Sequence, residues 1–185
     1  GYIRIRRGVY LRKAAIPETA APWQIRRLVS QARVLSVALT RRGTPPPIFS
    51  LESALAIHGL QTWTNTIDVS YRVEGNKGSH ETRTLRSVNA HGVAVSEVKE
   101  RQLVSAMPQF QTVPINGVLT APLGIVAVDC ARYLHPLAAV VAVSSVLAHA
   151  SEFDRWSLES SREKEARAKD VIRRQMTCIV GRRGS

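Results

Sequence analysis

Cysteine and aromatic side chains are scarce in this sequence, and their scarcity limits the classes of protein that it can encode. The two cysteines, Cys130 and Cys178, lie in apolar surroundings without a CxxC spacing, so we expect core thiols and neither a disulfide nor a metal site. Aromatic residues make up 5% of the chain. We therefore interpret Trp23, Trp63 and Trp156 as core or docking residues in preference to platforms for stacked bases.

Long apolar runs are also missing. The longest, LAAVVAVSSVLA at residues 137–148, contains two serines and is shorter than the roughly 20 apolar residues that cross a bilayer as a helix. The first residues carry arginine and tyrosine in place of the apolar segment of a signal peptide. We therefore predict a cytoplasmic protein with no membrane partner.

The sequence contains no signature of catalysis or metal binding. Its histidines follow neither an HxxxH nor an HExxH spacing and fall on different predicted elements: His58, His80, His91, His135 and His149. No GxSxG elbow indicates a Ser–His–Asp triad, although a triad assembled by the fold would leave no such trace. The glycines of EGNKG lack the GxxxxGK[ST] spacing of a phosphate-binding loop and lie between predicted strands. We predict no enzyme activity, no metal and no cofactor for this segment.

Acidic residues are nearly absent from the start of the chain, where its positive charge is concentrated. Residues 1–42 hold ten lysines and arginines and a single acid, Glu18, whereas residues 43–150 hold seven residues of each sign. Residues 151–185 add nine basic and six acidic residues to a formal net charge of +12. This distribution favours a polyanionic partner, because each neutralised phosphate releases condensed counterions. The alternative is a basic surface that serves only solubility.

The first 12 residues alternate apolar and basic side chains, with apolar positions Ile3, Ile5, Val9 and Leu11. The glycine within RRG predicts two short strands joined by a tight turn, or one strand with a bulge. We expect the basic residues of this element and of the following helix to contact phosphates: Arg4, Arg6, Arg7, Arg12, Arg26, Arg27 and Arg33.

The rest of the chain predicts helices around a small sheet. Apolar residues recur at steps of three and four from Trp23, which predicts an amphipathic helix that ends near Gly43, with Thr19 as its N-cap and Pro22 in its first turn. A short helix capped by Ser50 follows. Strands are predicted at 66–73 and 82–88, joined as a hairpin, at 92–98, and at an edge over 110–120; helices are predicted at 125–134, 137–148 and 153–176. We predict an α+β fold in which a basic N-terminal β element lies beside a domain of helices around a small, mostly antiparallel sheet.

Asp129 lies inside an apolar predicted helix, GIVAVDCARYL. A carboxylate in that position must be paired or hydrogen-bonded, or its pKa must rise. Arg132, three residues later, is the expected partner in a structural ion pair. The alternative is a contact between Asp129 and a binding partner.

Three segments in order, RIRRGVYLR, IFSLESALAIHGL and GVLTAPLGIVAVDCARYLHPLAAVVAVSSVLAHA, resemble the AbiEi-type antitoxin and transcription-regulator family. In that family a basic RRGVY strand closes an N-terminal winged-helix domain. The first segment matches through Arg7, Gly8, Val9 and Tyr10. The residues that match the second and third motifs are Ser50, Glu52, Ser53, Ala54, His58, Gly59, Thr120, Pro122, Asp129, Ala131 and Arg132. Gly124 and Ile125 stand where the family has an Arg–Thr pair.

The resemblance implies two domains: residues 1–18, the wing-like remnant of a winged-helix domain, and residues 19–185, an α/β interaction domain. Family members usually carry recognition helices ahead of the RRGVY strand, so we expect either a fragment of a longer protein or a member that has lost these helices. The function that follows is DNA-binding transcription regulation in a toxin–antitoxin or phage-defence module, with DNA phosphates as a partner and a cognate toxin or a second copy of the chain as another. The neutral residues 43–150 are the predicted interaction or dimerisation region.

Two other functions stay open. In many relatives a GRRG element precedes a segment like a very-short-patch-repair nuclease. The chain would then be the targeting part of a DNA-processing enzyme whose carboxylates lie beyond Ser185. It could instead be a pure protein-interaction module whose charge answers an acidic partner.

Overall fold

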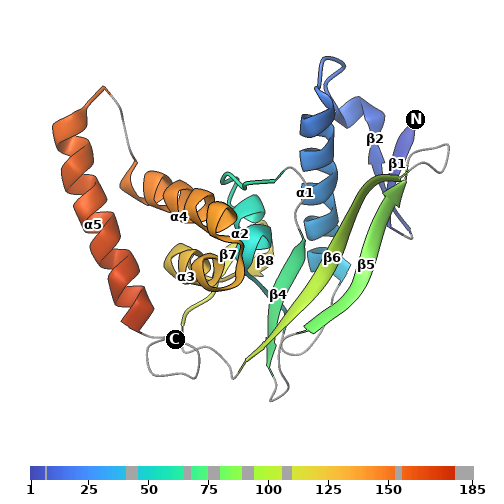
Figure 1. The fold of residues 1–185 in the computed structure, drawn as a ribbon. Coiled ribbons are helices and arrows are strands. Elements are labelled where there is room, and N and C mark those ends of the chain that lie inside the picture. Colours follow the sequence, from blue (N-terminus) through green and yellow to red (C-terminus); the bar gives the residue numbers. More distant parts are fainter. Residues whose placement is uncertain are drawn as a thin grey trace.

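The computed structural model describes residues 1–6, 8–40, 46–64, 68–74, 80–88, 94–105, 110–152 and 156–177 (Figure 1). Within these ranges the chain forms five α-helices, one 3-10 turn and eight strands, which confirms the predicted α+β class. The strands are β1 (Tyr2–Arg6), β2 (Val9–Arg12), β3 (Ile48–Phe49), β4 (Val69–Glu74), β5 (His80–Val88), β6 (Ala94–Ser105), β7 (Val113–Ile115) and β8 (Val118–Thr120). The helices are α1 (Pro22–Thr40), α2 (Leu51–Ile57), α3 (Leu123–Tyr133), α4 (Pro136–Ser151) and α5 (Leu158–Thr177), and the 3-10 turn is η1 (Lys13–Ala15).

The strands form one sheet in the order β2-β1-β5-β6-β4-β3-β8-β7. Among the described strands, β4 with β6 and β3 with β8 are the parallel pairs, so the sheet is mostly antiparallel as predicted. The N-terminal hairpin is part of this sheet, since Arg4 in β1 pairs with Val88 in β5. The basic N-terminal β element, which we predicted to lie beside the domain, therefore forms an edge of its sheet.

The predicted hairpin between residues 66–73 and 82–88 is wrong. The long strand β6 lies between β4 and β5: it pairs in parallel with Val69–Glu74 and antiparallel with β5. A two-residue Asn-Gly or Asp-Gly connection would fix the pairing of neighbouring strands, but five positions of the sequence, 75–79, separate β4 from β5. β6 has 12 residues and offers a long edge to each neighbour.

The two tight hairpins follow from glycines that adopt positive φ. Gly8, at φ +77°, joins β1 to β2 as predicted. The region 110–120 holds two strands where we expected one, because Asn116 (φ 50°) and Gly117 (φ 77°) turn β7 back onto β8. Two consecutive left-handed residues are the conformation of a type I′ turn. Pro114 lies in β7 at the outer edge of the sheet, where its missing N–H is tolerated.

Helices α1, α3 and α4 lie close to the predicted positions. Thr19 is not the N-cap of α1, because the helix begins three residues later at Pro22; the Gln24 side chain accepts a hydrogen bond from the Ala21 backbone N–H (2.7 Å). This is the backward half of a capping box, made by the third helical residue. Pro136 is the first residue of α4.

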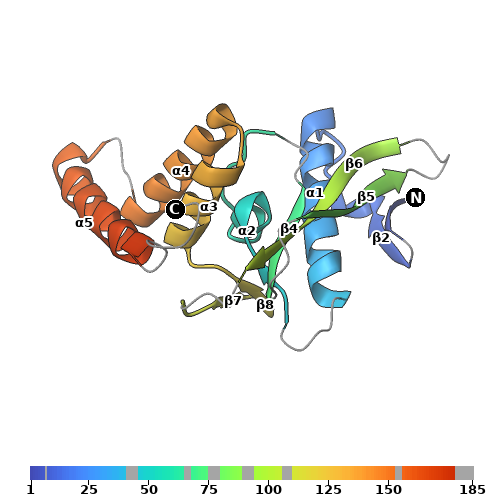
Figure 2. The same ribbon diagram turned by 60° about the horizontal axis from the view of Figure 1, so that its bottom comes forward.

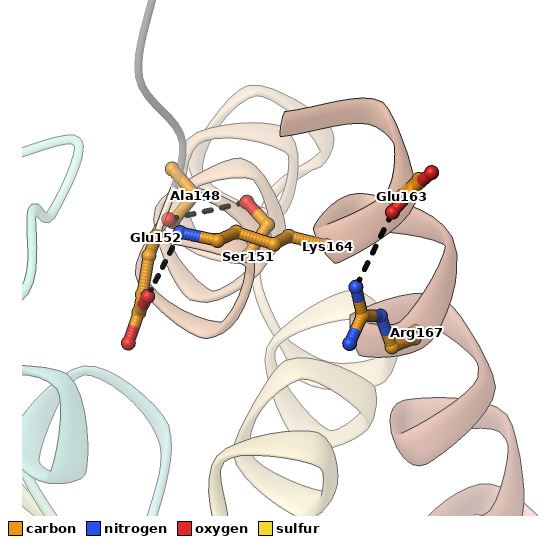
Figure 3. Close-up of polar contacts among 6 residues, drawn as sticks. All are labelled: Ala148, Ser151, Glu152, Glu163, Lys164 and Arg167. Atoms are coloured by element: carbon orange, nitrogen blue, oxygen red, sulfur yellow. Dashed lines mark hydrogen bonds and ion pairs between the residues drawn. The ribbon is translucent and has the colours of Figure 1, made fainter. Parts of the chain in front are cut away.

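The last helix, α5, begins at Leu158 and joins α4 through exposed charges (Figure 3). Lys164 pairs with Glu152, the residue after the end of α4, at 3.1 Å, and Arg167 pairs with Glu163 within α5 at 3.5 Å. Exposed pairs of this kind contribute little to stability, about 0–1 kcal/mol each. The attachment of α5 depends more on apolar contact, since Ile172 packs against the core formed by α2, α3 and α4.

Alternate residues of the central strands point to opposite faces of the sheet and pack in two separate buried clusters. Val69 and Tyr71 of β4 join Phe49 of β3 in a cluster with Val34 and Val37 of α1. Ile48 of β3 instead belongs to the cluster of α2, α3 and α4. Helix α1 therefore covers one face of this part of the sheet, and α3 and α4 cover the other; α2 packs in both clusters, through Leu55 in that of α3 and α4 and through Ile57 in that of α1. Helix α5 and the N-terminal hairpin lie at opposite ends of the molecule (Figures 1 and 2).

Candidate nucleic-acid interface and buried motif cluster

The N-terminal hairpin sorts its side chains onto two faces. Ile3 pairs with Leu11 in register, and both point toward α1, where Ile3 and Ile5 form a small core with Val29. The opposite face carries Tyr2 paired with Arg12 and Arg4 paired with Tyr10. Tyr2 is 52% exposed and Tyr10 is 60% exposed. We call the four residues Tyr2, Arg4, Tyr10 and Arg12 the outward face of the hairpin.

Both arginines of the outward face are exposed. Among the residues that the structure describes, the side chains of Arg4 and Arg12 have no recorded hydrogen bond or ion pair. Their guanidinium groups are therefore open to an external anion, and a phosphate is the anion whose geometry a guanidinium fits best.

The remaining predicted phosphate contacts are distributed differently. Arg6 is half-buried, and Arg7 lies outside the described residues. Arg33 is fully buried, so the expectation that it contacts phosphate is wrong. Burial lowers the pKa of Arg33 to about 10, which still leaves the side chain charged at neutral pH. It lies four residues after Val29 and four before Val37, on the stripe of α1 that packs against the sheet.

Arg26 and Arg27 belong to a second surface. They lie on α1, the helix that covers the inward face of the hairpin, so they do not share a face with Arg4 and Arg12. Arg26 is exposed, and Arg27 donates a hydrogen bond to the Gln61 side chain (3.3 Å). Arg27 also lines a shallow hollow of about 350 Å³ with Trp23, and a neighbouring hollow of about 690 Å³ shares Pro17 and Ala20 with it.

The residues of the second and third motifs meet in the interior, although they are far apart in the sequence. The Ser50 hydroxyl donates to Asp129 at 2.5 Å, across 79 residues. Arg72 of β4 forms an ion pair with Oδ1 of the same carboxylate, and its Nε lies 3.2 Å from Oδ2, the oxygen that also accepts the Ser50 hydrogen bond. The ion pair of Asp129 thus comes from β4; the expected partner, Arg132, lies with its guanidinium 5.5 Å from the ring centre of Tyr133.

Ser50 stands at the N-cap position of α2, but its side chain makes no capping bond; its hydroxyl instead donates to Asp129. Leu51, the next residue, is held at φ 52°, a left-handed conformation unusual for leucine. The strained residue at the start of α2 thus directly follows Ser50, which is hydrogen-bonded to Asp129. Both Ser50 and Asp129 are fully buried. We call Ser50, Arg72 and Asp129 the buried triad; it ties α2, α3 and β4 together.

Further motif residues connect α2 to strands β4 and β8. The Ser53 side chain accepts a hydrogen bond from the Ser70 backbone N–H (2.8 Å) and donates to the Asp68 carbonyl (2.9 Å). His58 Nε2 lies 3.2 Å from the Thr120 hydroxyl. Burial lowers the pKa of His58, and the nearby charge of His149 lowers it further.

The other motif residues have structural positions. Gly59 adopts φ 75° after the end of α2, and Pro122 is the N-cap residue of α3. Glu52 is half-buried in the first turn of α2. Gly124 lies where α5 approaches α3, because a Cβ built there would come within 2.0 Å of the Gln175 side-chain oxygen. These residues therefore contribute to the ends of the helices and to their packing.

The predictions that the cysteines and the tryptophans are core residues have different outcomes. Cys130 is a buried free thiol, and burial raises its pKa, as do Asp129 and Glu52 nearby; Cys178 lies outside the described residues. The tryptophans are not core residues, since Trp23, Trp63 and Trp156 are 45%, 55% and 81% exposed. Their alternative interpretation, as docking residues, stays a prediction.

The described part of the chain has no helix that is long and apolar enough to cross a membrane. The same residues contain no cluster of three histidine, cysteine or acidic side chains suited to a metal ion. No protein-family model, curated protein or solved structure matches the chain.

Proposed function

We propose that this chain is a cytoplasmic, DNA-binding transcription regulator of the antitoxin type, which contacts the DNA backbone with the outward face of its N-terminal hairpin. The observation that carries the proposal is the exposure of Arg4 and Arg12 on one face, with no recorded partner among the described residues. The concentration of positive charge in residues 1–42 supports it. The resemblance of the three motifs to AbiEi-type regulators supports the regulatory role.

The proposed contact does not by itself read a base sequence, because phosphate contacts position a protein on DNA and base edges specify the site. Arg26 on α1 would lie outside it, since that helix covers the other face of the hairpin. The buried triad takes no part in catalysis in this proposal. Its role is to hold α2 and α3 on the sheet.

Salt-dependent binding to duplex DNA tests this function. Fluorescence anisotropy with a labelled duplex of random sequence, between 50 and 200 mM salt, should show binding that weakens steeply as salt rises. Replacing Arg4 and Arg12 by glutamine should reduce the slope of log K against log salt by about two, since each phosphate contact contributes roughly one. The control Lys164→Gln/Arg167→Gln removes the same charge from α5, at the other end of the molecule, and should leave the slope unchanged.

Protein interaction is a second candidate, and the surface of α1 favours it. Trp23 is 45% exposed beside two neighbouring apolar hollows, and exposed tryptophan and arginine are common anchors of protein interfaces. If the duplex fails to bind at 50 mM salt while the chain still binds an acidic protein through Trp23, the interaction function replaces the DNA-binding one. Loss of that binding in Trp23→Ala, with Trp156→Ala as the control, would identify the surface.

A further inference from the structure

The proposed phosphate contact uses two residues of the outward face and leaves its two tyrosines without a role. Tyr2 and Tyr10 are 52% and 60% exposed, and each is paired across the hairpin with an arginine. They contribute no side chain to the core beneath, which is formed by Ile3, Ile5 and Val29. Two large aromatic rings are therefore held at the surface by a strand register that the core fixes.

The register also sets the spacing of the two rings. Tyr10 is paired with Arg4, and Tyr2 with Arg12, so the tyrosines are diagonal neighbours on the same face. Diagonal neighbours on adjacent antiparallel strands are about 7–8 Å apart. Two successive nucleotides of one strand can reach rings at that spacing, as they do on the sheet surfaces of single-strand-binding domains.

Arginines alternate with the tyrosines in both directions, along each strand and across the pair. A surface of this composition matches the two parts of an unpaired nucleotide, because the guanidinium group attracts the phosphate and the aromatic ring offers a stacking partner to the base. A duplex presents its phosphates equally well, but its bases are stacked within the helix and cannot lie on a tyrosine. β2 is also the terminal strand of the sheet, so nothing further in the strand order extends this face beyond it.

We propose that Tyr2 and Tyr10 stack with two unpaired bases of a DNA strand whose phosphates are bound by Arg4 and Arg12. The inference rests on the proposed function, since it uses the same arginine–phosphate contact. It adds that the preferred ligand is single-stranded DNA, or a duplex locally opened at the hairpin. The stacking is independent of base sequence, because every base has a π-face.

Three labelled 20-nucleotide probes separate the two contacts in anisotropy measurements on the full chain. They are a single strand of mixed sequence, the same strand annealed to its complement, and a strand of abasic sites with the same number of phosphates. We expect the single strand to bind at least tenfold more tightly than the abasic strand. Tyr2→Ala and Tyr10→Ala should each weaken the single strand about 5- to 100-fold and leave the abasic strand unchanged.

Control variants distinguish stacking from a change in fold. Tyr10→Phe keeps the ring and should bind the single strand as the native chain does. Tyr133→Ala removes a tyrosine that is 46% exposed on α3, away from the hairpin, and should have no effect. The tyrosines of the outward face are outside the core, so the circular dichroism melting curves of all variants should superimpose.

The outcomes separate this inference from the proposed function. Equal binding of the intact and abasic strands, unaffected by either tyrosine variant, would overturn the stacking and leave the phosphate contact in place. Failure of all three probes to bind would overturn both. Loss of binding in Tyr10→Phe as well as in Tyr10→Ala would also exclude stacking, because the ring would then matter less than the hydroxyl.

Discussion

At the scale of single residues, the buried triad holds a carboxylate and a guanidinium that are both largely removed from water. Asp129 is fully buried and the Arg72 side chain is 11% exposed, so each charge depends on the other for the solvation that water no longer supplies. The Ser50 hydroxyl satisfies one more acceptor position of the carboxylate. Charges buried in this way are tolerated only when the counter-charge and the hydrogen-bond partners are all present.

Asp129→Asn should destabilise the fold by about 3–5 kcal/mol, because it leaves the Arg72 guanidinium buried without its counter-charge. Arg72→Met combined with Asp129→Leu should recover most of that loss, since no unpaired charge then remains. Urea unfolding monitored by circular dichroism measures both. A double variant as unstable as the single one would show that the ion pair is not the reason for the loss.

His58 makes the stability depend on pH in the weakly acidic range. Its pKa is lowered in the folded chain, first by burial and then by His149. A base with a depressed folded pKa binds fewer protons when folded than when unfolded, so the free energy of unfolding falls as the pH drops below about 6.5 and levels off below the folded pKa. Urea midpoints at pH 7.5 and 5.5 should therefore differ more for the native chain than for His58→Gln.

His149→Gln refines the same prediction. His149 is exposed, and removing its charge should raise the pKa of the folded His58 ring toward its ordinary value and reduce the pH dependence in part. Nuclear magnetic resonance titration of the His58 ring follows the change directly. A His58 titration identical in the two proteins would contradict the influence of His149, and burial would then be the only cause.

At the scale of elements, the signals that predicted structure correctly were local. Alternation in residues 3–12, the glycine of RRG and Pro22 each act within a few positions, and the corresponding elements are present. The Asn-Gly pair at 116–117 carried an equally local hairpin signal between two short apolar runs, and that pair could have predicted both β7 and β8. Likewise, the four-residue spacing of Val29, Arg33 and Val37 placed this arginine on the apolar stripe of α1.

What the sequence could not predict depends on contacts between distant segments. The pairing of β4 with β6 and the partnership of Arg72 with Asp129, 57 residues apart, are decided by the packing of whole elements on the sheet. Reasoning from neighbouring positions alone therefore selected Arg132, three residues after Asp129, as the ion-pair partner of that carboxylate. The outward face of the hairpin could be predicted in part. The alternation assigns its residues to one side, but only the register places each tyrosine opposite an arginine.

At the scale of the whole molecule, the buried clusters on the two faces of the sheet share two elements, the two-residue strand β3 and helix α2. Phe49 packs with Tyr71 at a ring-centre distance of 5.9 Å in the layer of α1, whereas the adjacent Ile48 packs in the layer of α2, α3 and α4. The Phe49 carbonyl also accepts the Ala121 N–H (3.0 Å), just before α3 begins. A disturbance of β3 should therefore reach both layers.

Phe49→Ala should lower the free energy of unfolding by about 3–5 kcal/mol through the cavity it creates. Phe49→Leu is a milder variant that keeps the chain folded for hydrogen exchange measured by mass spectrometry. We expect faster exchange in peptides from α1 and from α3 together, because the opening of β3 removes a common support. The control Leu137→Ala truncates a side chain that is 54% exposed on α4 and should change neither helix. Faster exchange confined to α1 would instead mean that the two layers open independently, and that β3 belongs to the layer of α1 alone.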